Sequence, residues 1–154
     1  MGCNCLSRAY DLAGVLGWVV ASFFGKPLIE FLDLRRKVHE EIVYTGNVGF
    51  MDLQDEKQRA RYDEAVENLR RLGAKVQAID VAATTPLRFV LLKVGFNLEQ
   101  AGRGLIGLSN SLHLRDGGRM MQTAWIQNGL KLPRDFTDEQ IRESRKRMEQ
   151  GGQM

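Results

Sequence analysis

The feature that most constrains this chain is an uncharged run near its N-terminus. Residues 12–25 read LAGVLGWVVASFFG and contain no charged side chain, whereas the rest of the 154 residues is densely charged. A helix of about 20 apolar residues spans the roughly 30 Å hydrocarbon core of a bilayer. Extended to residues 9–26, with the long Lys26 side chain reaching the headgroups, the run predicts a single transmembrane helix.

Two other interpretations of this run stay open. Apolar runs of about 10 to 14 residues usually form buried helices of soluble proteins. Such helices normally carry a polar stripe, and here only Ser22 and the glycines are available to form one. The other interpretation is a cleaved signal peptide. It is disfavoured by the lone basic Arg8 and by the bulky Phe23 and Phe24, which stand where small residues precede cleavage.

Small residues recur every fourth position in the run, at Ala13, Gly17, Ala21 and Gly25. This spacing places them on one face of a helix. In lipid, such a face lets a second helix approach closely and gain van der Waals contact. We therefore predict a packing seam for another copy of the chain or for another membrane protein, although glycine and alanine are also generally frequent in spanning helices.

The distribution of basic residues predicts the orientation in the membrane. Arg8 alone precedes the run, whereas Lys26, Arg35, Arg36 and Lys37 follow it closely. The positive-inside rule therefore places the N-terminus outside and the C-terminal part in the cytoplasm. We expect these four residues to face anionic headgroups, each adding about 1 kcal/mol of attraction.

The remainder of the chain predicts a series of amphipathic helices. Pro27 suits the first position of a new helix, because its missing N–H needs no partner there. Helical periodicity and breakers predict helices over 28–44, 55–83, 86–94, 98–114, 120–130 and 137–150. In the first, we expect the apolar face to contain Leu28, Phe31, Leu32, Val38, Ile42 and Val43. In the second, we expect it to contain Tyr62, Ala65, Val66, Leu69, Leu72, Val76 and Ile79.

Local signals mark several helix ends. Gly95 suits a helix C-cap, Asn97 with Gln100 and Thr137 with Gln140 have capping-box spacing, and residues 116–118 suit a turn. The expected fold is all-α, with an N-terminal transmembrane helix followed by an antiparallel helical bundle. We divide the chain into residues 1–26 (N-terminus and spanning helix), 27–135 (cytoplasmic bundle) and 136–154 (polar helix and tail).

No motif predicts a cofactor or metal site. Residues 102–107 match G-x-G-x-x-G, but no strand precedes them and no acidic residue follows at the required distance, so we interpret them as a small-residue helix face. Gly104, Gly107 and Ser111 form that face. Cys3 and Cys5 cannot complete a zinc site, and we interpret them as terminal cysteines without a special role; the alternatives are pairing between chains and, in a eukaryotic host, palmitoylation beside the spanning helix. His39 has no potential ligand at helical spacing.

The function predicted from these features is a membrane-anchored, non-catalytic interaction protein. Its partners are membrane lipids and itself or another membrane protein; the net charge of +3, from 22 basic and 19 acidic residues, is too small to indicate nucleic acid. One alternative is a small tethered enzyme with a site near Asn110 and His113, because Asn110 lies in a polar cluster of an otherwise apolar helix. The other is a soluble helical subunit of a larger complex.

Overall fold

The computed structural model describes residues 14–15, 17–18, 20–46, 54–83, 85–113, 117–137, 139–143 and 146. Every regular element in these ranges is helical, as the sequence predicts. The elements are η1 (Ala21–Gly25), α2 (Lys26–Thr45), α3 (Glu56–Ala82), α4 (Thr85–Val94), α5 (Leu98–Ser111) and α6 (Gly117–Leu130). The polar C-terminal helix is described only as a short segment over 139–143.

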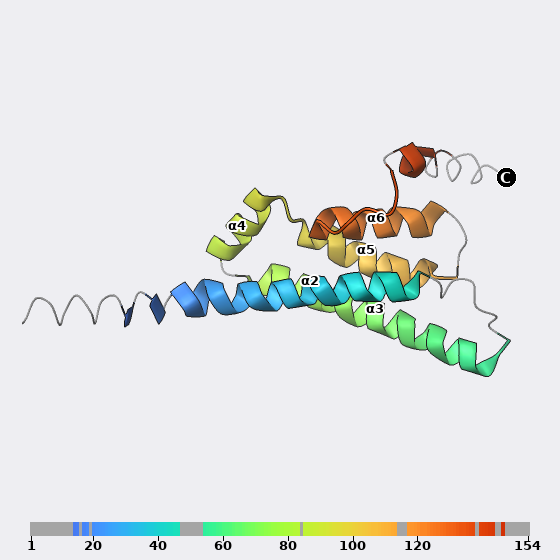
Figure 1. Cartoon of the computed structure of the whole chain (residues 1–154), viewed down its shortest axis with the longest axis horizontal. Helices are drawn as coiled ribbons and strands as arrows, with labels where there is room; N and C mark the ends of the chain where they lie inside the picture. Colours follow the sequence, from blue (N-terminus) through green and yellow to red (C-terminus); the bar gives the residue numbers. More distant parts are fainter. Residues whose placement is uncertain are drawn as a thin grey trace, which may run out of the picture.

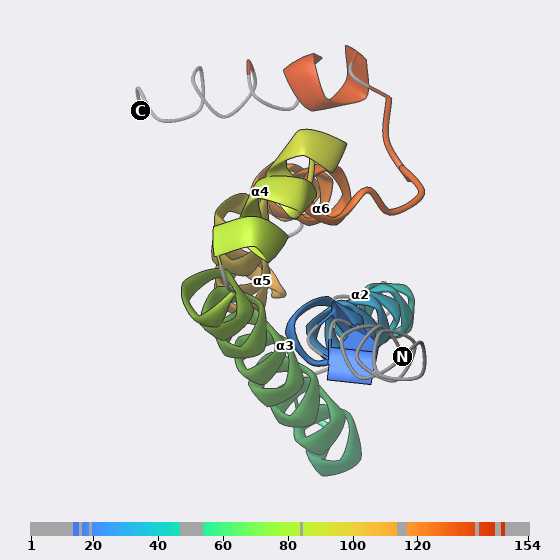
Figure 2. The same cartoon turned by 90° about the vertical axis from the view of Figure 1, so that its left-hand side faces the viewer.

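The four long helices form the antiparallel bundle that the sequence predicts. Each of α3, α5 and α6 runs opposite to the long helix before it, and the short α4 joins α3 to α5 at the end of the bundle where α2 begins (Figure 1). Viewed from that end, α5 lies between α3 and α6, and α2 lies beside α3 (Figure 2). The element η1 and the start of α2 therefore lie at the same end of the bundle as α4.

One apolar core joins all the helices from α2 to α6. On α3, Ala65, Leu69, Leu72 and Val76 are buried, which confirms the predicted face. On α2, the predicted face is partly wrong. The buried positions are Phe31, Leu34, Val38, Ile42 and Thr45, whereas Leu28, Leu32 and Val43 are exposed. Phe31 also packs edge-on against Phe96, with ring centroids 5.0 Å apart.

Glycines allow α5 to pack closely against helices on both sides. A Cβ at Gly73 of α3 would lie 3.3 Å from the Gly102 carbonyl oxygen, and one at Gly102 would lie 3.4 Å from the Gly73 carbonyl oxygen. On the α6 side, a Cβ at Gly104 would lie 2.8 Å from Ile126 Cγ1, and Gly107 meets the Gln122 side chain. The G-x-G-x-x-G run is therefore a helix-packing surface, as predicted.

Two arginines connect the first and last long helices. Arg35 of α2 donates from Nε to the Leu130 carbonyl at 2.8 Å and also bonds the Lys131 carbonyl at 2.7 Å. Arg119 of α6 donates to the carbonyls of Thr45 and Gly46, at 2.7 and 2.8 Å. The last carbonyls of a helix have no partner within it, so each arginine caps the C-terminus of the opposite helix.

The predicted caps are confirmed where the structure describes them. Gly95 ends α4 at φ +91°, and the Phe96 N–H donates to the Leu91 carbonyl at 2.9 Å, the bond of a Schellman motif. The Asn97 side chain accepts from the Gln100 N–H at 2.9 Å. Thr137 and Gln140 cap each other reciprocally. The turn predicted at 116–118 is wrong in part, because α6 already includes Gly117 and Gly118.

Pro27 lies in the first turn of α2, as the sequence predicts, but α2 directly continues the helical backbone before it. The backbone passes helically from Val20 through η1 into α2, and the Lys26 N–H donates to the Ala21 carbonyl, five residues back. Proline has no N–H, and its ring clashes with the carbonyl four residues before it in a regular α-helix. The wider π turn just before Pro27 accommodates both effects without ending the helix.

Candidate functional site

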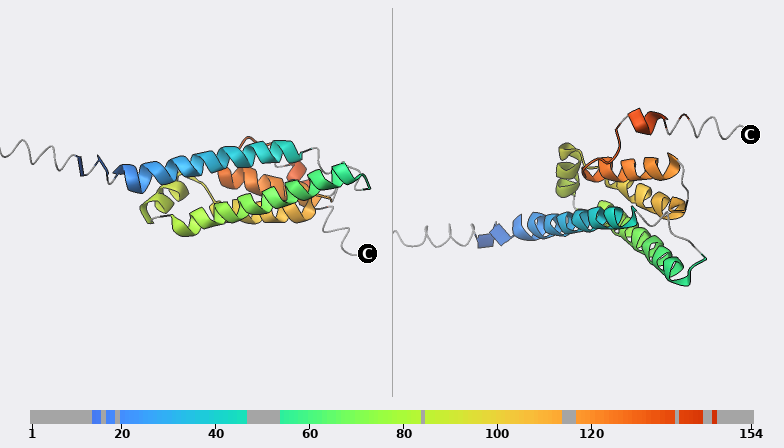
Figure 3. Two further views of the ribbon diagram at one scale, coloured as in Figure 1. Left: turned by 90° about the horizontal axis from the view of Figure 1, so that it is seen from below. Right: turned by 45° about the vertical axis from the view of Figure 1, so that its right-hand side comes forward.

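Large exposed apolar residues gather at one end of the bundle. They lie on the start of α2, the end of α3 and the outer side of α4, three segments that meet at the end from which the N-terminal segment departs (Figures 1 and 3). We call this set the apolar end; it comprises Leu28, Ile29, Leu32, Val81, Phe89, Val90, Leu92 and Val94. Large apolar side chains exposed on neighbouring elements are candidates for an interaction site.

The described part of the N-terminal run does not pack on the bundle. Val15, Trp18 and Val20 are 60%, 67% and 58% exposed. A Cβ added at Gly17 or Gly25 would have no neighbouring atom within 4 Å among the described residues. The described residues of the run therefore do not contribute to the core of the bundle. Across the described parts of the chain, no helix combines the length and the apolar character needed to cross a membrane.

The structure describes three of the four residues of the predicted packing seam and all four of the basic residues that follow it. Ala21 is exposed like Gly17, whereas Ala13 lies outside the described residues, as do Arg8, Cys3 and Cys5.

Of the four basic residues, Lys26 is exposed at the start of α2 and Arg35 turns inward to cap α6. Arg36 and Lys37 both pair with Asp33, at 3.0 and 2.7 Å. These pairs hold the pKa of the Asp33 carboxyl below its usual value, through the Lys37 hydrogen bond first and the Arg36 hydrogen bond second. At 1.5 Å per residue, Arg35 to Lys37 begin about 14 Å along the helix from Lys26.

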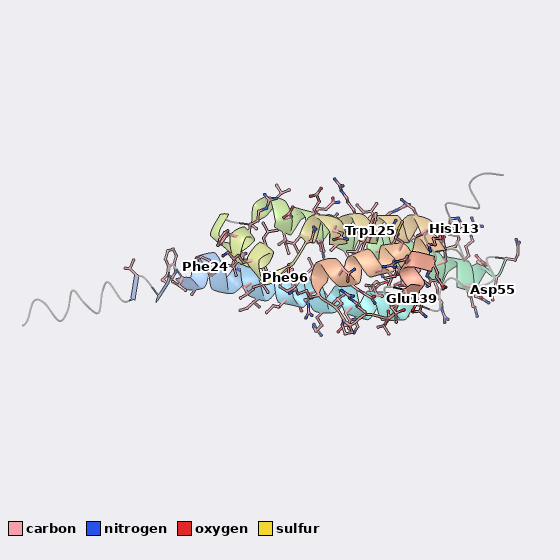
Figure 4. All side chains as sticks on the ribbon, turned by 90° about the horizontal axis from the view of Figure 1, so that it is seen from above. Phe24, Asp55, Phe96, His113, Trp125 and Glu139 are labelled. Carbon is pink, nitrogen blue, oxygen red and sulfur yellow. The ribbon has the colours of Figure 1, made fainter. Side chains whose placement is uncertain are left out.

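Neither Asn110 nor His113 lines the two hollows found among the described residues. Asn110, from the polar cluster of this otherwise apolar helix, is exposed on α5, where its Oδ1 accepts from Arg70 at 3.1 Å. The neighbouring Ser109 and Ser111 are buried instead and bond carbonyls of their own helix. The exposed His113 lies 3.4 Å from the Tyr62 hydroxyl, at the opposite end of the molecule from Phe24 (Figure 4).

A half-buried carboxyl group lies between α2 and α3. Burial is the main cause that raises the pKa of Glu41; the nearby Glu64 carboxylate adds to it, while a hydrogen bond from Asn68 and the charge of Arg71 oppose it. Its Oε1 atom is buried with no hydrogen-bond partner among the described residues. Such a group lowers stability when it is ionised, and Glu41 does not line the hollow beside Gly95 or the hollow beside Trp125.

Two open hollows lie among the described residues. One, of about 420 Å³, is lined by Gly95, Gln127, Asn128, Lys131, Leu132 and Arg134. The other, of about 330 Å³, is lined by Asn97, Glu99, Gln100, Arg103 and Trp125. In the described parts of the chain, no three His, Cys, Asp or Glu side chains gather closely enough to hold a metal ion. Neither hollow brings together a nucleophile and a base.

The chain has no match among known proteins in three comparisons: no protein-family model matches it, and neither does any curated protein or solved structure that was compared.

The outward side of α4 is the feature that sequence reasoning missed. The helix was predicted over 86–94, but its exposed residues were not singled out. The sequence contained a signal for it, because α4 has more large apolar residues than one buried stripe of a helix contains. They are Leu87, Phe89, Val90, Leu91, Leu92 and Val94. Two of them, Leu87 and Leu91, meet the core and the other four are exposed.

Proposed function

We propose that this chain is a membrane-anchored, non-catalytic helical protein whose bundle acts as an interaction module held at the membrane surface. The observation that carries the proposal is the exposure of Val15, Trp18 and Val20 on an uncharged run that projects from the bundle. Apolar surface left in water is unfavourable by about 25 cal/mol per Å², so such a run needs an apolar environment other than its own core.

The proposal includes a topology. Residues 9–26 span the bilayer as one helix, with the N-terminus outside and the bundle in the cytoplasm, because the basic residues Lys26, Arg35, Arg36 and Lys37 follow the run. Gly17, Ala21 and Gly25 leave one side of this helix free of bulk, which suits association with another copy or another membrane helix. The experiments below separate this proposal from a soluble subunit of a larger complex.

Extraction of membranes with alkaline carbonate tests the anchor. The informative variant combines Val15→Arg with Val20→Arg, because both side chains are exposed and their replacement leaves the core intact. An arginine in a spanning helix costs about 2.5–3.5 kcal/mol near the centre. The matched control combines Val43→Arg with Tyr44→Arg, which are also exposed but lie at the far end of α2.

We expect the natural chain and the control to stay in the membrane pellet after carbonate treatment, and the Val15/Val20 variant to move to the supernatant. All three should retain the same helical circular dichroism spectrum. A natural chain that stays in the supernatant without detergent contradicts the proposal. Protease accessibility of tags at the two termini then tests the orientation: digestion of both tags from outside the cell, or of the C-terminal tag alone, contradicts it.

A further inference from the structure

Helix α4 has apolar residues not only on its buried side but also on its outer side, where a surface helix normally has polar ones. Leu87 and Leu91 are buried in the core, so the helix is already anchored by one stripe. Phe89 and Leu92 on its outer side are nevertheless 60% and 59% exposed. Surface helices of soluble domains place polar side chains opposite the buried stripe. The outer side of α4 therefore resembles a second buried face without a partner in the bundle.

The charged side chains of α4 are both basic. Between Val81 and Leu98 the only charged residues are Arg88, which pairs with the Asp80 carboxylate of α3 at 3.5 Å, and Lys93. Lys93 Nζ lies 5.3 Å from the centre of the exposed Phe89 ring, so its ammonium group extends over apolar surface. A short helix with outward apolar side chains, basic residues and no acidic ones is typical of segments that lie in a membrane interface.

The position of α4 relative to the N-terminal run indicates what covers it. The last residues of the run, in η1, lie at the end of the bundle that α4 occupies (Figure 1). Leu28, Ile29 and Leu32 follow Gly25 by three to seven residues, which is about 5 to 10 Å along a helix. A run inserted in the bilayer thus brings these residues to the depth of the headgroup and acyl boundary, where interfacial helices bind.

We propose that the apolar end, and above all the outer side of α4, is a lipid-contact surface that lies in the membrane interface. This inference rests on the proposed membrane function and extends it, since the bundle then sits with its α4 end against the bilayer rather than hanging from a free linker. The continuous helical path from Val20 through η1 into α2 supplies the rigid connection that such a placement needs.

Spin labels on the full-length chain test this placement. Cys3→Ser with Cys5→Ser removes both natural cysteines. Each variant then receives one new cysteine, Phe89→Cys, Leu92→Cys, Val20→Cys or Val43→Cys, and a nitroxide is attached to its thiol. The protein is reconstituted into vesicles of phosphatidylcholine and phosphatidylserine. Collision of each label with oxygen, which concentrates in lipid, is compared with collision with a water-soluble nickel complex. Val43 is the matched control, because it is 63% exposed at the opposite end of α2.

We expect the oxygen-to-nickel collision ratio at positions 89 and 92 to be several-fold higher than at 43. A water-like ratio at 89 and 92 with a lipid-like ratio at 20 overturns the inference and leaves the anchor in place. A water-like ratio at all four positions overturns both. Low collision with both reagents at 89 and 92 means that protein covers α4 and overturns the inference; dipolar broadening then identifies the cover as a second copy.

Discussion

Replacing Gly104 by alanine tests the close packing of α5 between α3 and α6. A Cβ at this position would lie 2.8 Å from Ile126 Cγ1, 3.1 Å from the Gln122 carbonyl oxygen and 3.3 Å from the Ile126 amide nitrogen. The last two are backbone atoms of α6, so a change of rotamer cannot relieve the contact. The two helices must move apart, and the contacts between them are weakened along their length.

Two effects of opposite sign determine how far Gly104→Ala changes the unfolding free energy. Alanine in a helix interior is favoured over glycine by about 1 kcal/mol. Forcing an extra methyl group into a packed interface costs about 1–3 kcal/mol, and the upper part of that range applies because backbone atoms form the obstacle. The expected net loss is about 2 kcal/mol of unfolding free energy, which lowers the melting temperature by about 4–8 °C for a chain of this size.

Urea unfolding followed by circular dichroism, in mild detergent, measures the loss. The matched control is Gly17→Ala, the same chemical change at a position with no neighbouring atom within 4 Å among the described residues. We expect the control to leave the midpoint unchanged or slightly raised. If Gly104→Ala is as stable as the natural chain or more so, helix propensity alone governs the site and the close-packing argument is refuted.

Four further changes give expected outcomes for separate features. Arg119→Gln removes the cap on the C-terminus of α2 and should lower the unfolding free energy by about 1–2 kcal/mol in urea titration; no loss contradicts the capping role. Lys131→Gly relieves a residue at φ +51° and should raise stability by up to about 1 kcal/mol by the same assay; a lower midpoint contradicts that reasoning. Gly17→Ile with Ala21→Ile should leave carbonate resistance intact but reduce crosslinking between copies in detergent; unchanged crosslinking removes the seam. Since burial raises the folded-state pKa of Glu41, the protonated form favours folding and stability falls as pH rises from the ordinary value of 4.5 through the folded value. Glu41→Gln should therefore reduce the loss of unfolding free energy with rising pH. If the unfolding free energies of the variant and the natural chain run parallel over this pH range, this role of Glu41 is contradicted.

Much of the fold follows from local sequence signals. The face of α3 was predicted because its apolar residues recur with helical spacing between charged ones. Gly95 and Asn97 were predicted as caps because each position needs a particular backbone or side chain. The small-residue face of α5 was predicted because the cofactor motif lacked its strand.

Other features were missed, or depend on contacts that a local pattern does not contain. Residues 28–34 of α2 include five apolar side chains, and the predicted face included Leu28 and Leu32. Leu34 is buried instead, because it lies four residues before the buried Val38 and shares its face of the helix. Arg35 reaches carbonyls 95 and 96 residues away, a pairing that no spacing rule reveals. Asn110 is exposed because α5 buries two opposite faces, and those faces contain its serine neighbours.

The most direct test of the membrane account is the environment of Trp18, which is exposed on the N-terminal run. The chain has two tryptophans, so Trp125→Phe leaves Trp18 as the sole reporter. In vesicles, we predict blue-shifted Trp18 emission that lipids brominated on their acyl chains quench strongly and a water-soluble quencher affects little. Emission typical of tryptophan in water, quenched from the aqueous phase and unaffected by brominated lipid, contradicts the account.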